Sequence, residues 1–154
     1  MNQNWLRLAK NVLKTVQEKE MMVMTLQDTI QLYQQIGDIR SKCNVVKDLV
    51  CVHKEIKAAQ EGKKGPEPDL LLIEYLVVLY TSLFQIEEDR QCLEVYYEVK
   101  RLLDDIRPEY VTEVVKARRK MLDDTKPKIQ ELEQKFKAVK EAEDKKLEEE
   151  RGAL

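Results

Sequence analysis

The chain has 154 residues, of which 36% are charged, and its 27 Lys and Arg nearly balance its 29 Asp and Glu for a formal net charge of −2. This balance excludes a general attraction to nucleic acid or to an anionic membrane surface, so no nucleic-acid partner is expected. Four Gly and four Pro are too few for the many turns of a β protein, which indicates an all-α fold.

The N-terminal segment has the pattern of an amphipathic, basic helix. Asn4 can cap it, and apolar residues recur about every 3.6 residues from Trp5 to Val16. Residues 1–17 contain no acid, a composition that is also typical of a mitochondrial transit peptide. The lack of Ser and the single Arg favour a structural helix, with a targeting segment as the alternative.

A second periodic stretch follows, made up of Val23, Leu26, Ile30 and Tyr33. No Gly or Pro separates it from the first stretch, so the sequence leaves open whether the helix breaks near residues 18–21. Three methionines, Met21, Met22 and Met24, lie in this region. Because methionine adapts its shape to irregular gaps, we interpret the cluster as core packing, with a protein interface as the alternative.

Gly37 and Asp38 predict the end of one helix and the start of the next, since Gly favours the C-terminal turn and Asp the N-cap. The third helical stretch has an apolar stripe formed by Ile39, Cys43, Val46, Leu49 and Ile56. It ends near residues 60–62. Residues 63–68, which include Gly65 and two of the four prolines, then form a loop.

The run Leu70–Ile86 (LLLIEYLVVLYTSLFQI) is the most apolar part of the chain and contains one charged residue, Glu74. A helix that is apolar nearly all round must be covered on most sides. We therefore place this segment at the centre of the fold, with Asp69 as its N-cap. A membrane span needs about 20 apolar residues and rarely tolerates a carboxylate, so no integral membrane segment is expected.

The remaining apolar positions predict further helices, for a total of six or seven. One stripe consists of Cys92, Tyr96, Val99, Leu103 and Ile106. Pro108 can open the next helix, whose inward residues would be Tyr110, Val114, Ala117 and Met121. Pro127 can open the last one, with a stripe of Ile129, Leu132, Phe136 and Val139. From residue 140 to residue 151, ten of twelve residues are charged, which predicts a solvent-exposed helical tail.

The sequence contains no motif typical of catalysis or of metal or cofactor binding. His53 is its single histidine, and no Cys-x-x-Cys, His-Glu-x-x-His or Gly-rich phosphate loop occurs. The basic run 116–120 has no interleaved aromatics for base stacking, so we interpret it as a solvated helix face. We expect a non-enzymatic protein with no catalytic residues, no cofactor and no metal.

The three cysteines, Cys43, Cys51 and Cys92, are an odd number and give no disulfide framework. Cys43 and Cys51 are eight residues apart, about 12 Å along one helix, which is too far for a bond. Reduced, buried thiols indicate an intracellular protein. We expect it in the cytoplasm, the cytoskeleton or the cilium, with the mitochondrion as the alternative.

Two segments match each other at a constant offset of fifty residues, and each has the pattern of a helix pair. The aligned pairs are Leu26 with Leu76, Ile30 with Tyr80, Tyr33 with Leu83, Gly37 with Glu87, Val46 with Tyr96 and Leu49 with Val99. On these residues, the chain from about 26 to 106 resembles tetratricopeptide repeats. Glu87 and Lys42 depart from that pattern, which has small residues at both places, and the family's spacing is about 34 residues.

The resemblance implies a partner peptide or helix bound along a concave face, which the first helix of each pair would line. The partner-binding residues that it implies are Gln27, Gln31, Gln34, Glu74, Val77, Thr81 and Phe84.

The predicted architecture is all-α, with antiparallel helical hairpins in a short repeat array or bundle and a charged C-terminal helix. Residues 1–124 would form the hairpin domain, and residues 125–154 a charged, solvent-exposed tail. The expected function is that of a scaffold or adaptor, which binds protein partners within a larger complex through helix grooves. The alternative is a structural accessory subunit of a large ciliary, cytoskeletal or mitochondrial assembly.

Overall fold

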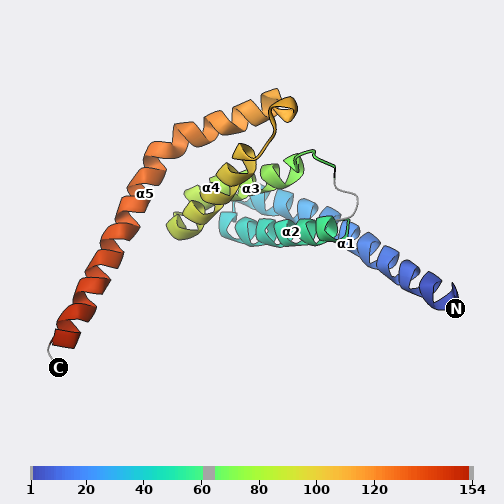
Figure 1. Ribbon diagram of the computed structural model, residues 1–154, viewed down its shortest axis with the longest axis horizontal. Helices are drawn as coiled ribbons and strands as arrows, with labels where there is room; N and C mark the ends of the chain where they lie inside the picture. The colour runs from blue at the N-terminus through green and yellow to red at the C-terminus, as the bar shows by residue number, and fades with distance from the viewer. Residues whose placement is uncertain (1, 61–64, 153–154) are drawn as a thin grey trace. The chain divides into compact units, whose positions relative to one another are not determined.

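The computed structural model describes residues 2–60 and 65–152, with side chains from residue 15 onward. These residues contain α-helices and one short 3-10 helix but no strand, so the predicted all-α fold is confirmed (Figure 1). The elements are α1 (Asn2–Ile36), α2 (Ile39–Ala59), α3 (Leu70–Gln85), α4 (Asp89–Asp104), η2 (Pro108–Tyr110) and α5 (Glu113–Gly152). The side chains of the predicted N-terminal stripe, up to residue 14, and loop residues 63 and 64 lie outside the described part.

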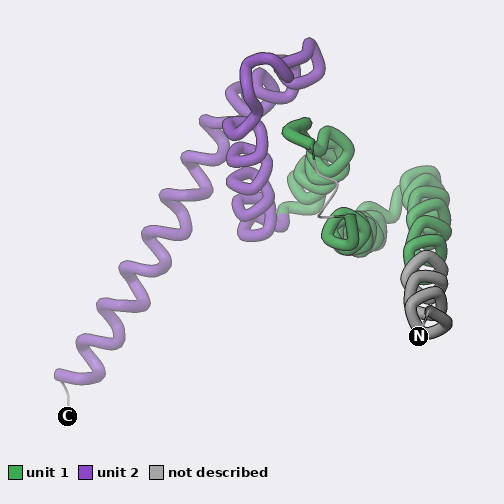
Figure 2. Tube along the Cα trace, turned by 45° about the vertical axis from the view of Figure 1, so that its right-hand side comes forward, with its two compact units in different colours: residues 1–87 green, residues 88–154 purple. Residues whose placement is uncertain are grey.

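The chain divides into two compact units, residues 1–87 and residues 88–154, which Figure 2 shows in different colours. The predicted boundary between residues 124 and 125 falls inside α5, which continues across it without interruption. The separate role of residues 125–154 as a tail stays a prediction. Residues 140–152 are all helical and exposed, whereas Ile129 and Leu132, earlier in the same segment, are buried.

In unit 1, α1 and α2 form an antiparallel hairpin. Lys19 Nζ lies 3.4 Å from Glu55 Oε2 at one end, and Lys42 Nζ donates to Gln34 Oε1 at 2.5 Å at the other. The predicted α2 stripe is confirmed, and its buried residues are Cys43, Val46, Leu49, Val50, Val52, His53 and Ile56. Because α2 packs against α3 as well, α2 is the helix that packs extensively on both other helices of this unit.

The predicted apolar helix is α3, and the carboxylate of Asp69 caps it by accepting a hydrogen bond from Leu72 N at 3.1 Å. Its buried residues are Leu72, Ile73, Leu76, Val77, Leu79, Tyr80, Ser82 and Leu83. Leu71 and Val78 are 49% and 36% exposed and mark its open side. None of the described helices is long and apolar enough to span a membrane.

Two turns that are fifty residues apart each contain a residue with a left-handed φ. Gly37 has φ +76° and Glu87 has φ +56°, and each is followed at once by the N-cap of the next helix, Asp38 or Glu88. A left-handed residue ends a helix well because it frees the next amide to bond back to the last turn. Gly adopts this conformation without cost, whereas Glu does not.

In unit 2, α4 and α5 form a second antiparallel hairpin. The predicted α4 stripe is confirmed, with Cys92, Tyr96, Val99, Leu103 and Ile106 all buried. The predicted inward face at the start of α5 is wrong by one position, since Val114 is 48% exposed and Val115 is fully buried. The buried residues Val115, Leu122 and Ile129 recur every seven residues, so they lie on one side of the helix.

The prediction of six or seven helices is wrong, because the described residues form five α-helices. The first helix runs on through residues 18–21 as α1. Pro108 opens the short η2, and α5 itself starts at Glu113. Pro127 lies inside α5 instead of opening a new helix. Its fixed φ is compatible with a helix, but the helix loses one backbone hydrogen bond there and bends. Figure 1 shows α5 bent along its length.

Replacing Leu76, which is 1% exposed, by Ala should lower the free energy of unfolding by about 2–5 kcal/mol, since it leaves a cavity in the α3 core. The matched control is Leu71→Ala, on the 49% exposed side of the same helix, where a change within about 0.5 kcal/mol is expected. Urea denaturation measures both. Equal losses for the two variants would contradict the assigned core face.

Glu87→Gly should raise the free energy of unfolding by about 1 kcal/mol, because it relieves a left-handed φ of +56°. Gly37→Ala should lower it by a similar amount, since no atom lies within 4 Å of the added Cβ and the φ of +76° is the sole obstacle. Thermal and urea denaturation of both variants check the pair. A loss of stability in Glu87→Gly would show that this residue is not strained.

Candidate functional site

The three glutamines predicted to bind a partner, Gln27, Gln31 and Gln34, are all exposed on α1. Gln27 Nε2 donates to the hydroxyl of Tyr75 on α3 at 2.8 Å, and Gln34 Oε1 accepts from Lys42 on α2. Two of the three therefore also hold the helices of unit 1 together. That they bind a partner stays a prediction.

The four predicted residues on α3 lie in different environments. Thr81 is exposed, and its hydroxyl donates to the carbonyls of Val77 and Val78 at 3.1 Å. Glu74 and Phe84 are half-buried, and the Phe84 ring meets that of Tyr80 edge-on at 4.8 Å between centroids. Val77 is 6% exposed and offers almost no surface to a partner. Their role in binding also stays a prediction.

The interpretation of the methionine cluster as core packing is wrong. Met21, Met22 and Met24 are 68%, 50% and 67% exposed. The four-residue and three-residue spacing that brings Val23, Leu26 and Ile30 toward α2 turns these methionines outward.

A groove with a partly apolar lining lies between α4 and α5 in unit 2. It has a volume of about 510 Å³. Leu93 and Tyr97 of α4 and Phe136 and Val139 of α5 supply its apolar lining. The charged side chains around it are Arg90, Glu94, Lys140 and Glu143.

Polar contacts hold the two walls of this groove at a defined separation. Lys135 Nζ donates to Asp89 Oδ2 at 2.9 Å, and the Tyr97 hydroxyl donates to Glu133 Oε1. The guanidinium carbon of Arg90 lies 5.4 Å from the centroid of the Phe136 ring, within the range of a cation–π contact. The groove walls are therefore set before any partner binds.

The sequence did not predict this groove, because the sequence pattern does not show which residues of α5 lie beside the start of α4. The predicted stripe of Ile129, Leu132, Phe136 and Val139 is buried at its first two positions, half-buried at the third, and 46% exposed at Val139. Asp89, the first residue of α4, lies beside Lys135. The apolar stripe of α5 therefore extends past the N-terminal end of α4, the helix that covers it.

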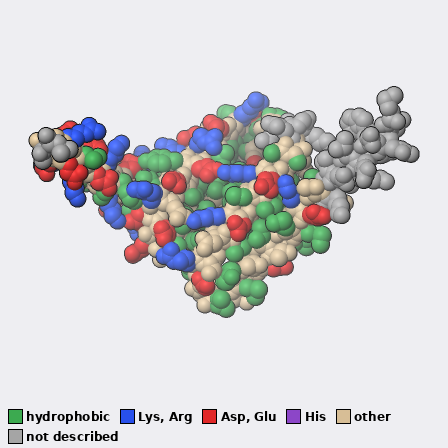
Figure 3. Space-filling view, turned by 90° about the horizontal axis from the view of Figure 1, so that it is seen from below, with side chains coloured by type: hydrophobic (Ala, Val, Ile, Leu, Met, Phe, Trp, Pro, Cys, Tyr) green, Lys and Arg blue, Asp and Glu red, His purple; other side chains and the backbone are tan. Residues whose placement is uncertain are grey.

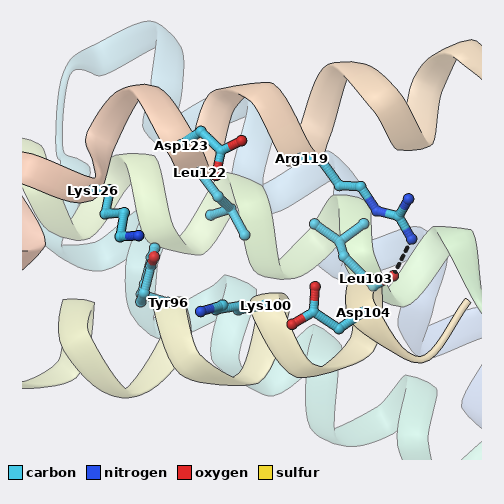
Figure 4. Close-up of a pocket in the computed structure, with 8 residues that line it drawn as sticks. All are labelled: Tyr96, Lys100, Leu103, Asp104, Arg119, Leu122, Asp123 and Lys126. Atoms are coloured by element: carbon cyan, nitrogen blue, oxygen red, sulfur yellow. Dashed lines mark hydrogen bonds between the residues drawn. The ribbon is translucent and has the colours of Figure 1, made fainter.

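A second, smaller pocket of about 160 Å³ lies further along the same hairpin (Figure 4). Arg119 Nη2 donates at 2.7 Å to the carbonyl of Leu103, in the last turn of α4, which also accepts a hydrogen bond from Ile106 N at 3.3 Å. The other charged residues of the pocket are of both signs: Lys100, Asp104, Asp123 and Lys126. This arrangement caps α4 and fastens α5 to it.

His53 and the buried cysteine in unit 2 have structural surroundings. His53 is 6% exposed, and its Nε2 lies 2.7 Å from Oδ2 of Asp69, the N-cap of α3. This contact joins α2 to the start of α3. Burial, followed by the nearby charge of Asp89, raises the pKa of the Cys92 thiol to about 12, so the thiol stays protonated at neutral pH. None of the three cysteines forms a disulfide, but Cys51 is exposed, against the prediction that all are buried.

No protein-family model, curated protein or solved structure matches this chain. The resemblance to tetratricopeptide repeats therefore stays a prediction. Within residues 2–60 and 65–152, no three His, Cys, Asp or Glu side chains are grouped so that they could hold a metal ion.

The hydrogen bond between Tyr97 and Glu133, with a smaller contribution from burial, raises the pKa of Tyr97 from 10.0 to about 12. Because the folded value is the higher one, the stabilisation from this contact is complete below the unfolded pKa. It is lost as the pH rises from about 10 through about 12. Ultraviolet titration of the wild type and of Tyr97→Phe should show one late-titrating tyrosine that the variant lacks. If the tyrosine that the variant lacks titrates in the wild type at the ordinary pKa of about 10, the contact is contradicted.

Proposed function

We propose that this protein is a non-enzymatic adaptor subunit, which binds a helical segment of a partner protein in the groove between α4 and α5. The observation that carries the proposal is the apolar stripe of α5, which extends past the start of α4 and leaves Phe136 and Val139 beside a groove of about 510 Å³.

An amphipathic helix fits the chemistry of this surface. Such a helix places side chains at i, i+3, i+4 and i+7 along one face, and these can bury themselves against Leu93, Tyr97, Phe136 and Val139. Aromatic residues at the centre of an interface supply much of its binding energy. Tyr97, which lines the groove, is held by its contact with Glu133, and the Lys135–Asp89 contact joins the two helices beside it, so little ordering is needed on binding.

The charged residues around the groove select the orientation of the partner. Arg90 and Lys140 are basic, whereas Glu94 and Glu143 are acidic, with one of each sign on each helix. A partner helix with charges of both signs beside its apolar face meets opposite charges in one direction and like charges in the other. Charge matching of this kind contributes more to specificity than to affinity.

The alternative, a structural accessory subunit of a large assembly, draws on a different observation. The C-terminal part of α5 is exposed on every side, and Figure 3 shows acidic and basic side chains together at the end of the molecule that carries it. A long helix with charges all round suits lateral contacts with neighbouring subunits. A purified chain that is monomeric and unfolds cooperatively supports the adaptor, and a chain that is insoluble without neighbours supports the accessory subunit.

Val139→Glu tests the adaptor proposal. The variant places a carboxylate in the apolar lining and should weaken partner binding at least about tenfold, because an unpaired charge would have to be buried. Partners are captured with the full chain and identified by mass spectrometry, and the affinity of each is then measured with both proteins.

The matched control is Leu147→Glu, since Leu147 is a similarly exposed residue on the same helix, at 54% against 46% for Val139, and does not line the groove. A partner bound by the wild type and by Leu147→Glu but lost by Val139→Glu supports the groove. Full retention of every partner by Val139→Glu, in a chain that circular dichroism shows to be folded, would overturn the proposal.

A further inference from the structure

The α1 seam is a row of residues along one side of α1 that begins at Glu18 and contains exposed apolar side chains, with two threonines, Thr25 and Thr29, between them. Residues 18, 22, 25, 29, 32 and 36 are separated by alternating steps of four and three, the spacing of a seam between two packed helices. Met22, Leu32 and Ile36 on this seam are 50%, 61% and 71% exposed, and Met21 beside it is 68% exposed. The side of α1 that packs on α2 lies next to the seam and is formed by Val23, Leu26, Ile30 and Tyr33, of which Leu26 also borders the seam.

The seam is long enough to hold a helix. From residue 18 to residue 36 it extends about 27 Å, or five turns. At its N-terminal end, Glu18, Met21, Met22, Thr25 and Leu26 surround a hollow of about 360 Å³. The hydroxyls of Thr25 and Thr29 are turned back onto the helix, where they donate to the carbonyls of Met21 and Thr25. These two threonines therefore present mainly their methyl groups to a partner.

The exposed charges on residues 15–36 of α1 have one sign. Among residues 15–36, whose side chains are described, the exposed charged residues are Glu18, Glu20 and Asp28. Lys19 is the one cation in this range, and it is half-buried and paired with Glu55 of α2 at 3.4 Å. A partner therefore meets an acidic surface, which repels anionic lipid headgroups and attracts a cationic helix.

We propose that this α1 seam binds a basic amphipathic helix of a partner protein. Methionine suits such a site, since its unbranched, polarisable side chain adapts to apolar residues of different shapes. The apolar face of the partner would cover Met22, Leu32 and Ile36, while its Lys or Arg residues would lie beside Glu18 and Asp28. The inference deepens the proposed adaptor function by naming the chemistry of a second partner. It concerns unit 1, whereas the groove lies in unit 2.

The probe for this site is a synthetic 18-residue helix made of Leu and Lys, with Leu at i, i+3, i+4 and i+7 (a length of about 27 Å). Its control is the same peptide with Glu in place of every Lys. Fluorescence anisotropy with the full chain should show binding of the Lys peptide and at least about tenfold weaker binding of the Glu peptide. Higher salt should weaken the Lys peptide, because part of the attraction is electrostatic.

Two variants locate the binding surface. Leu32→Ser should weaken the Lys peptide at least about tenfold, whereas Leu71→Ser, at a comparably exposed position on α3 of the same unit, should leave it unchanged. Glu18→Lys combined with Asp28→Lys should reverse the preference between the two peptides. These positions are exposed, so the variants retain the fold, which circular dichroism verifies.

Three results would overturn the proposal: equal binding of both peptides, unchanged binding by Leu32→Ser, or a dimer in sedimentation that Leu32→Ser dissociates, which assigns the seam to a second copy of the chain. Val139→Glu should leave the Lys peptide bound, because that residue belongs to the groove of unit 2. Failure of the seam and failure of the groove are therefore separate outcomes.

Discussion

The difference in length between paired helices governs which surfaces of this protein are exposed. In unit 2, α5 has 40 residues and α4 has 16, which corresponds to about 60 Å against about 24 Å. In unit 1, α1 has 35 residues and α2 has 21. A short helix covers its longer partner over part of its length, and any apolar stripe that continues further remains exposed to solvent. The groove beside Phe136 and Val139 arises in this way.

Polar contacts mark where the covering ends. In unit 2, the pair Lys135–Asp89 lies at the start of α4, and the bond from Arg119 to the Leu103 carbonyl lies at its end. In unit 1, the pair Lys19–Glu55 lies near the end of α2. Exposed ion pairs contribute little to stability. Their main effect here is to set the register of each hairpin, and with it the position of the uncovered apolar residues.

The two proposed surfaces differ in charge, and this difference separates their partners. The α4–α5 groove has charged residues of both signs on both helices, whereas the exposed charges among residues 15–36 of α1 are all acidic. Like charges across an interface cost binding energy, so a strongly basic helix is favoured at the α1 seam and gains less at the groove. An adaptor with two such surfaces can hold two different segments at once.

The sequence by itself determined the helical character of the chain, the caps at Asp38 and Asp69, the stripes of α2 and α4, and the apolar helix α3. These features depend on interactions within about four residues, which a 3.6-residue period and a capping side chain reveal directly. The matching left-handed residues at Gly37 and Glu87 also follow the offset of fifty that the sequence shows. Tertiary structure alone decided how far each helix is covered. Burial depends on where the partner helix begins, and that position is set by contacts between residues far apart in the chain. For this reason Val115 rather than Val114 faces α4, Val139 is exposed, and the methionines of α1 lie on the surface instead of in the core.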